Sequence, residues 1–328
     1  MCGWLVGPDV VGTAARALIV SERRITGLSQ VVIADLVAEL GPVWQARRDA
    51  ELCDRPRRRA VGAGAKYKLV FVDRLLATLV HLRHGVTHDV LACWFDVDRS
   101  TITRAVGQIR PLLADRGCRI APGQRLRTLA DVIAHLGATG RTGIIDATEI
   151  RVRRPAAHRR GRNRFVSGKS RMNAMKALVV TDDRGRLLFC GEVRAGSVAD
   201  ITQVRDAGLV DLLADTVHLE ILADADYQGL AAQTYGQVVT PPRKRRGKNL
   251  DQVQWLMAHH EQARFEHSSR RIPVEHGIAH LKNWRALARH HGHRHHLPDT
   301  IRALAGLLSD QQATHKRKLL TLPAGRAA

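Results

Sequence analysis

The chain has 328 residues, with 52 Lys and Arg against 31 Asp and Glu, and a formal net charge of +21. This charge excludes an ordinary acidic metabolic enzyme and indicates a polyanionic partner, either nucleic acid or an anionic membrane surface. A hydrophobic content of 45% excludes a disordered basic tail. No apolar run reaches the roughly 18 residues that span a bilayer, so we expect no membrane partner. The length predicts two domains, or one large domain with an appendage.

The cysteines and the first twenty residues indicate a cytoplasmic protein. None of the five cysteines belongs to a Cys-x-x-Cys pair, and their spacing excludes a zinc finger, so we expect reduced thiols. Residues 1–20 are fairly apolar, but Asp9 and Arg16 interrupt them and no basic segment leads them, which argues against a secretory signal.

The N-terminal half is predicted to be helical. Apolar residues at a helical period predict a helix over 28–48, and the basic, Gly-rich residues 55–64 suggest a linker. Residues 1–60 are therefore expected to form an N-terminal helical arm and a basic linker. Further helices are predicted over 70–82, over 88–95 and from Arg99 onward.

Two of these helices are short and are separated by a tight turn, which is typical of a helix-turn-helix. An ordinary helical bundle would give the same pattern, but the net charge favours DNA binding. We therefore predict an all-α helix-turn-helix domain over residues 61–135, in which Ile102 and Val106 face inward. The expected DNA contacts are polar side chains at the start of the second helix: Arg99, Ser100, Thr101, Thr103 and Arg104.

After about residue 140 the pattern becomes that of an α/β domain. Strands are predicted over 143–152, 174–181 and 187–193, followed by a helix over 199–214, strands over 218–222 and 237–240, and helices from 250 to about 312. Residues 140–312 are assigned to this domain, and residues 313–328 to a basic C-terminal tail.

Two aspartates end predicted strands in apolar surroundings. Asp146 follows Gly-Ile-Ile, and Asp224 follows Ile-Leu-Ala. An ionised carboxylate in such a place is costly unless it is paired or bound to metal. Phosphodiester chemistry uses such acids to hold two divalent ions, although each aspartate alone could equally cap a turn or a helix.

A third acid, Glu275, lies between two cations on one predicted helix. Arg271 and Lys282 stand at i−4 and i+7 from it, on or near one face. A carboxylate in this setting suits a metal site that also receives a phosphate backbone. An ion-pair ladder on a solvated helix would give the same spacing.

Seven segments in this order resemble the DDE transposases, specifically bacterial insertion-sequence enzymes of the "five" family and their Harbinger-like endonuclease relatives. The family signature is tyrosine, two residues, arginine, three, glutamate, six, lysine, and Arg271, Glu275 and Lys282 match its last three members. The segments are 75–87, 98–104, 144–150, 167–169, 195–200, 221–229 and 274–285.

The resemblance implies a ribonuclease-H-like mixed sheet flanked by helices, with Asp146, Asp224 and Glu275 as catalytic residues and metal ligands. It implies two Mg²⁺ ions, for which Mn²⁺ can substitute, and DNA contacts from Arg271 and Lys282. The expected function is a transposase that binds the terminal inverted repeats of a mobile element, cleaves a strand with water and joins the freed 3′ hydroxyl to target DNA. Its partner is double-stranded DNA, on which it is expected to be a homodimer or larger, and its expected location is the nucleoid.

The chain departs from the family pattern at two positions near this predicted site. Ser268 occupies the signature tyrosine position, and Asp226 stands where the family has glycine. If that position needs a positive φ, aspartate costs about 1 kcal/mol, and it also adds a charge beside Asp224. Two alternatives therefore stay open: a catalytically impaired DNA-binding remnant and a plain hydrolytic endonuclease.

Other polar groups have less specific interpretations. Strand alternation predicts that Glu149 points away from Asp146, and Asp200 is expected to cap a helix or to support the site. The basic stretches 141–171 and 243–248 would contact DNA phosphates. The crowded histidines of 290–296 cannot all reach one tetrahedral ion, so DNA contact or an exposed helix end is favoured over zinc.

Overall fold

The structure is a computed structural model that describes residues 18–19, 22–53, 68–216, 218–243 and 254–321. The predicted linker, residues 55–64, lies outside the described residues, as does the basic run 243–248 except for Arg243. The ends of the chain, residues 1–17 and 322–328, lie outside them too.

The N-terminal region is helical, as the apolar periodicity predicts. Its helices are α2 (Arg23–Thr26), α3 (Gln30–Cys53), α4 (Phe71–His84), α5 (His88–Trp94) and α6 (Arg99–Ala114). Gly85 ends α4 in the left-handed region at φ 67°, and the Thr87 hydroxyl accepts a hydrogen bond from the Val90 amide at the start of α5. Phe95 and Ile102 are fully buried in a small core of α4, α5 and α6, which form the helix-turn-helix.

The second half contains a six-stranded mixed sheet. Its strands are β3 (Gly143–Val152), β4 (Ala174–Asp182), β5 (Leu187–Ala195), β6 (Ile221–Leu222), β7 (Val238–Val239) and β8 (Arg289–His290). The order is β5-β4-β3-β6-β7, with β4 antiparallel to β3 and β5, and β6 parallel to β3 and β7. Short β8 runs parallel to the end of β3. This order is the ribonuclease-H-like topology, so the predicted fold is confirmed.

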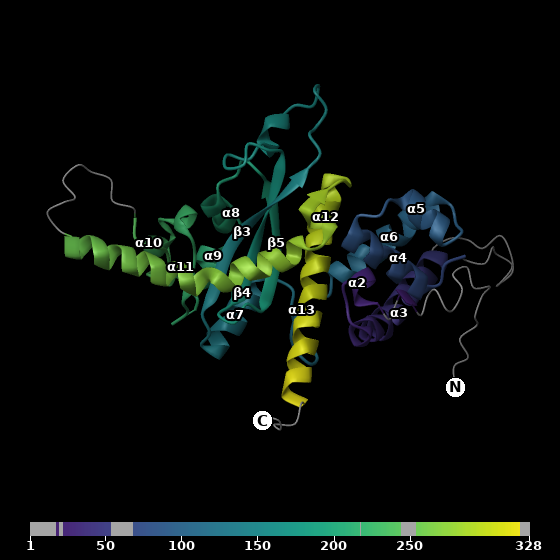
Figure 1. Cartoon of the computed structure of the whole chain (residues 1–328), viewed down its shortest axis with the longest axis horizontal. Helices are drawn as coiled ribbons and strands as arrows, with labels where there is room; N and C mark the ends of the chain where they lie inside the picture. Colours follow the sequence, from purple (N-terminus) through teal and green to yellow (C-terminus); the bar gives the residue numbers. More distant parts are fainter. Residues whose placement is uncertain (1–17, 20–21, 54–67, 217, 244–253, 322–328) are drawn as a thin grey trace, which may run out of the picture.

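Helices cover both faces of the sheet, because alternate residues of its strands are apolar on both sides. Ile145 packs on the face covered by α7 (Leu129–Thr139), α8 (Asp200–Asp206) and α9 (Leu209–Ala214). Ile144 packs on the opposite face, under α11 (Gln254–Lys282) and α13 (Leu297–Thr321). Figure 1 shows α11 crossing the sheet and α13 standing between the sheet and the helix-turn-helix region.

Several element boundaries differ from the sequence prediction. The helix expected over 199–214 is split into α8 and α9 by Gly208, whose φ is 76°. The expected strands 218–222 and 237–240 shrink to two residues each. A hairpin of β1 (Cys118–Ala121) and β2 (Gln124–Leu126) and helix α7 lie where no element was predicted. Residues 313–321, expected to be a tail, continue α13.

Helix α13 gives the helix-turn-helix region and the sheet a common core. Its Leu304 and Leu307 are fully buried in one apolar cluster with residues of α3, α4, α6 and the sheet. Helix α7, which falls in the range expected for the DNA-binding domain, instead packs on the sheet through Val132 and Leu136. The recognition elements are thus built onto the α/β region.

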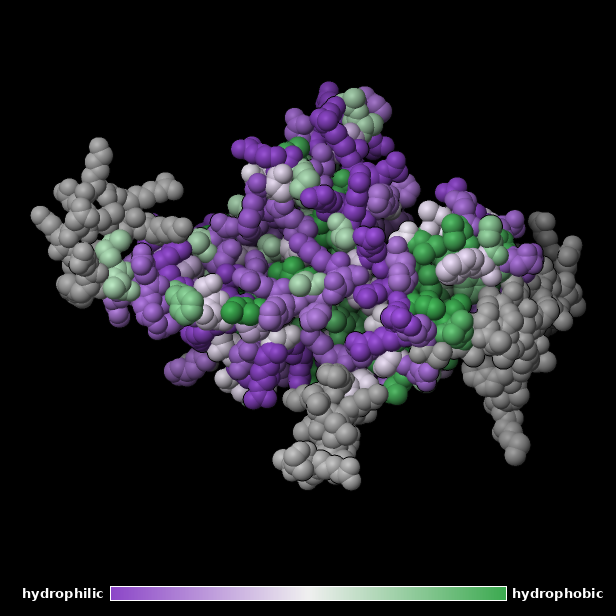
Figure 2. Space-filling view, in the orientation of Figure 1, coloured by the Kyte–Doolittle hydropathy of each residue, from purple (hydrophilic) through white to green (hydrophobic). Residues whose placement is uncertain are grey.

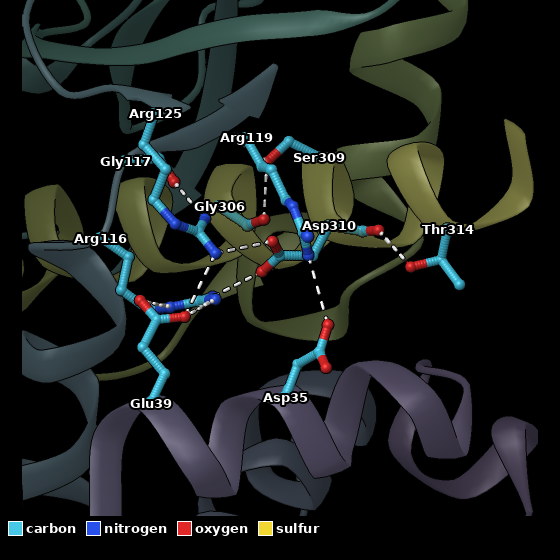
Figure 3. Close-up of polar contacts among 10 residues, drawn as sticks. All are labelled: Asp35, Glu39, Arg116, Gly117, Arg119, Arg125, Gly306, Ser309, Asp310 and Thr314. Carbon is cyan, nitrogen blue, oxygen red and sulfur yellow. Dashed lines mark hydrogen bonds and ion pairs between the residues drawn. The ribbon is translucent and has the colours of Figure 1, made fainter. Parts of the chain in front are cut away.

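A buried ion network reinforces this junction (Figure 3). Asp310 of α13 accepts from Arg116 at 2.5 Å and from Arg125 at 3.0 Å, and its side chain is 2% exposed. Arg116 also donates to Glu39 of α3 at 2.7 Å. Three segments far apart in sequence therefore share one set of charges.

The surface is largely hydrophilic over the sheet region in the face drawn in Figure 2, while hydrophobic residues gather over the helical region. Among the described helices, none is long and apolar enough to cross a membrane.

Candidate active site

Asp146 lies within β3, and Asp224 lies two residues beyond the end of β6, the parallel strand next to it. Ile144 of β3 is in register with Leu222 of β6, so each aspartate follows two residues beyond a paired position. Both side chains line a cavity of about 370 Å³, and Glu275 of α11 lines it too. The structure therefore brings the three predicted acids together from three separate segments.

Helix α11 presents a mixed face to this cavity. Glu275 is exposed, and Ile278 and Lys282, one and two turns further along the helix, line the same cavity. Lys282 is exposed as well, in a position open to an anionic ligand. Arg271 differs from the expectation of a DNA contact: it is buried, and its guanidinium forms an ion pair with Asp146 at 3.2 Å.

The Asp146 carboxyl group is unusually hard to ionise. Burial raises its pKa to about 6, an effect that the Arg271 charge opposes and the Asp224 charge reinforces. Its Oδ1 also accepts a hydrogen bond from the Ala147 amide at 2.7 Å. Burial thus outweighs the Arg271 charge and the Ala147 hydrogen bond in setting the pKa of Asp146.

Asp224 caps a short 3₁₀ turn, η2 (Ala225–Tyr227), by accepting from the Asp226 amide at 2.8 Å. Burial raises the pKa of Asp224, and the neighbouring Asp226 charge raises it further. Asp226 itself is exposed and helical, and it is not among the described residues with a positive φ. The backbone at Asp226 therefore does not need glycine for a left-handed conformation. Asp96, in the turn of the helix-turn-helix, does have a positive φ of 47°.

Two further acids reach the cavity. Asp200 does not cap α8 as expected, because Ala199 is the cap and Asp200 is the first residue of the helix. The Asp200 carboxylate forms an ion pair with Lys176 of β4 at 2.7 Å. Glu149, expected to point away, also lines the cavity because its carboxylate is held by the hydroxyls of Ser167 and Ser170 at 2.5 and 2.8 Å. No sequence spacing signals these contacts, since the partners are 18 to 24 residues apart.

Several polar atoms near the acids are buried without a hydrogen-bond partner among the described residues: Thr148 Oγ1, Tyr227 Oη and Arg271 Nε. Tyr227 is fully buried, and its pKa is raised by burial and by the charges of Asp146 and Asp200. The Thr148 side chain lines the cavity, as strand alternation from Asp146 predicts. The site is thus rich in unsatisfied polar groups.

The residues present fit a divalent cation by their chemistry. The donors are hard carboxylate oxygens. A bound cation would offset the electrostatic repulsion among these partly buried carboxylates. In the described part of the chain, however, no three His, Cys, Asp or Glu side chains stand close enough to hold an ion without rearranging. One Asp146 oxygen is engaged by Arg271, and Glu275 extends from an exposed helix face.

The start of α6 offers a second polar surface. Arg99, Ser100, Thr103 and Arg104 are exposed and Thr101 is partly exposed, while Ile102 and Val106 are buried. The His88 ring contacts the Thr103 hydroxyl at 2.9 Å, which ties α5 to α6. The side chains expected to read DNA thus lie on the solvent side of the second helix.

Comparison with known protein families identifies the same two regions, the helix-turn-helix and the α/β region. A family model described as "DDE superfamily endonuclease" matches residues 145–309, about half of the chain, and one described as "Helix-turn-helix of DDE superfamily endonuclease" matches residues 67–119. No curated protein gives a significant match.

Two solved structures are similar to the chain only weakly. A pre-cleavage Mos1 transpososome is 10% identical, with 69% of this chain and 81% of that chain covered at a TM-score of 0.18. A Mos1 strand transfer complex is 12% identical, with 81% and 84% covered at a TM-score of 0.18. The strand order β5-β4-β3-β6-β7, and not these likenesses, defines the fold. By the match to its family model, the chain belongs to the DDE superfamily of endonucleases.

Proposed function

We propose that the protein is a transposase that binds the terminal inverted repeats of a mobile element and catalyses metal-dependent strand cleavage and strand transfer. Asp146, Asp224 and Glu275 are its catalytic carboxylates. The observation that carries the proposal is the convergence of these acids on one cavity, with Asp146 on β3 and Asp224 two residues beyond the adjoining parallel strand β6. The helix-turn-helix of the same superfamily supports DNA as the partner.

Enzymes of this superfamily generally use divalent metal ions. In this chain Asp146, Asp224 and Glu275 would hold two Mg²⁺ ions, for which Mn²⁺ substitutes. Bound there, the ions would activate the attacking oxygen and stabilise the leaving oxygen of a phosphodiester.

The protein's own groups prepare the site. Arg271 fixes the orientation of Asp146 through their ion pair and offsets part of the repulsion among the buried acids. Lys176 does the same for Asp200. Lys282 is exposed at the cavity, so it can contact the DNA phosphate next to the scissile bond without losing an existing partner among the described residues.

Sequence recognition is assigned to α6. Arg99, Thr103 and Arg104 project into solvent from its first turns, the position from which a recognition helix contacts base edges in the major groove. Joining two element ends to one target requires more than one active site, so the protein is proposed to act on DNA as a homodimer or a larger assembly.

The test is an assay of strand nicking and joining on linear DNA that carries the ends of the element, with Mg²⁺, Mn²⁺ or EDTA. We expect nicking and joining only with metal, and at least about a thousandfold loss of rate, or ~4 kcal/mol of barrier, in Asp146→Asn, Asp224→Asn and Glu275→Gln. Asp183→Asn, at an exposed hairpin turn, is the matched control and should keep the parent rate. Metal-dependent nicking without any joining would reassign the protein as a hydrolytic endonuclease.

One observation favours the alternative of a DNA-binding remnant. The charge of Asp226, where the family has glycine, raises the pKa of Asp224 and so works against an ionised metal ligand. Specific binding to element ends with no nicking under any metal would favour the remnant.

A further inference from the structure

A second and larger cleft, of about 800 Å³, lies between the helix-turn-helix and the end of the sheet. One wall is formed by the end of α4, the start of α5, and α6. The other is formed by α12 (Arg285–Ala288), β8, and η4 (Arg294–His296). Figure 1 shows α12 next to the helix-turn-helix helices at the upper end of α13. The cleft shares no lining residue with the cavity of the three acids.

The lining of this cleft is strongly one-sided in charge. Six arginines and seven histidines line it, and no Asp or Glu is found among its described lining residues. Arg153 enters from the residue after β3, Arg99 from the start of α6, and Arg289 from β8. A concave site with only cationic or neutral groups selects a polyanion, because clefts of one sign focus the field on the ligand.

Arg110 of α6 is the strongest indication that this cleft binds an anion. Its residue is only 9% exposed, it lines the cleft, and its Nε is buried without a hydrogen-bond partner among the described residues. Burial lowers the pKa of its guanidinium, and the Asp299 charge, which opposes this shift, is paired with Arg302 at 2.8 Å. A buried cation without its own carboxylate is costly, and a phosphate oxygen would satisfy it.

The histidines report the same excess of positive charge. The pKa of His296 is lowered to about 4, first by its burial and then by Arg110 and neighbouring His295. Burial also lowers the pKa of His81 and His290, and Arg110 contributes in both cases. The folded protein therefore favours the neutral form of these rings, and a bound anion would favour their protonated form.

We propose that this cleft binds the phosphodiester backbone of double-stranded DNA, flanking the stretch that α6 reads. Duplex DNA is favoured over other polyanions because Arg99 and Thr103 of the recognition helix form part of the cleft wall. That the bound DNA is the end of a mobile element rests on the proposed function. That the cleft binds a phosphodiester backbone rests on the residues of the cleft.

Strand β3 links the cleft to the cavity of the acids. Asp146 lies within it, and Val152, at its end, is paired with His290 of the cleft. Val152 is six residues further along β3 than Asp146, a distance of about 20 Å of strand, or about six base pairs of duplex. DNA held in the cleft is thereby placed at a set distance from the proposed cutting site.

The test measures binding of the full chain to a fluorescent duplex of arbitrary sequence, over a series of salt concentrations. We expect Arg285→Gln/Arg289→Gln to weaken binding at least about tenfold near physiological salt, and to reduce the slope of log K against log salt by about 2, since each phosphate contact contributes ~0.9. The matched control is Arg47→Gln/Arg205→Gln, at two exposed positions outside both cavities, and its slope should stay within about 0.5 of the parent.

Arg110→Gln is the sharper variant, and thermal melting checks whether it folds. If it does not fold, the exposed pair Arg285 and Arg289 decides. Equal slopes for the cleft and control variants would overturn the cleft while leaving the nicking proposal intact. If the protein binds DNA through the cleft but nicks no DNA, the cleft proposal is supported and the proposed activity is contradicted. A parent that binds no duplex at low salt, or a larger cleft effect on RNA than on DNA, would also overturn it.

Discussion

Arg271 and Asp146 form an ion pair at 3.2 Å, with side chains only 10% and 20% exposed. The arginine comes from α11 and the aspartate from β3, so this contact attaches the helix that carries Glu275 to the central strand of the sheet. The cation occupies a place among the acids where a divalent ion would also relieve repulsion. Arg271 therefore acts as an internal counter-ion for the site.

This ion pair predicts that Arg271 and a bound metal ion both offset the repulsion among the buried acids. Arg271→Ala should lower the free energy of unfolding by about 2 kcal/mol in EDTA, because it leaves Asp146 without its charged partner. Mg²⁺ or Ca²⁺ should then raise the melting temperature of the variant more than that of the parent. Arg270→Ala, which removes a half-exposed partner of Glu220 on the same helix, should cost under about 1 kcal/mol and show no extra response to metal. Identical metal responses in all three proteins would contradict the counter-ion role.

Asp226 provides a test of whether this copy is impaired. Asp226→Asn removes the charge that raises the pKa of Asp224 and keeps the amide that caps it. Mg²⁺-dependent nicking should rise several-fold in this variant and in Asp226→Gly, with a change in stability of no more than about 1 kcal/mol. Asp224→Ala should abolish nicking. Unchanged rates in the Asp226 variants beside an inactive Asp224→Ala would mean that Asp226 does not limit this enzyme.

The network around Asp310 predicts a large loss of stability. Asp310→Asn leaves the buried Arg116 short of a counter-charge, which should cost about 3–5 kcal/mol in urea unfolding. Asp35→Asn removes the partner of Arg119 at 3.3 Å, but Asp35 is 47% exposed, so its loss should cost less than about 1 kcal/mol. Comparable costs for the two variants would show that burial of the network is not what stabilises the junction.

The pH dependence of stability follows from His296. Its pKa falls from 6.5 to about 4 on folding, so between these values the unfolded chain binds the extra proton and stability drops as the pH falls. Asp299 opposes this shift, whereas His293, His295 and Arg110 reinforce it. The melting temperature of the parent should fall more from pH 8 to pH 5 than that of His296→Gln. His259→Gln, an exposed histidine on α11, should behave like the parent.

Base reading by α6 is tested at Arg104. This side chain is exposed and contacts only its own helix, through the Ser100 carbonyl and the Thr101 hydroxyl, among the described residues. Arg104→Ala should weaken binding to the element ends by about 1–3 kcal/mol and binding to unrelated DNA by much less. Equal losses on both DNAs would assign Arg104 to a phosphate. The stability of the variant should change by under about 0.5 kcal/mol.

Local sequence patterns predicted the elements that have strong alternation or clear ends. Residues 143–152 were predicted as a strand and form β3, because apolar residues alternate between two buried faces. The sequence does not reveal the break at Gly208, because a single glycine is tolerated in many helices. Strand β8 was missed because Arg289 and His290 are polar, and only pairing with β3 makes them a strand.

The candidate site was predictable in its acids but not in its partners. Asp146 and Asp224 could be found because an acid directly after a run of buried apolar residues is unusual, although β3 continues beyond Asp146 to Val152. The pairing of Arg271 with Asp146 could not, since a helical repeat does not say which of several cations turns inward. Pairs such as Lys176 with Asp200 depend on the packing of β4 against α8, which no spacing in the sequence encodes.

The position of α13 has a consequence for how the protein matures. It completes the core of both the reading helices and the sheet, yet it is the last described helix to be synthesised. Contacts such as that of the Ser29 amide with the Gln311 side chain join residues 282 positions apart. Contacts of this kind cannot form on the ribosome until α13 has emerged, so folding of both regions is completed late. Premature termination upstream of α13 would thus yield neither a competent DNA reader nor a competent nuclease.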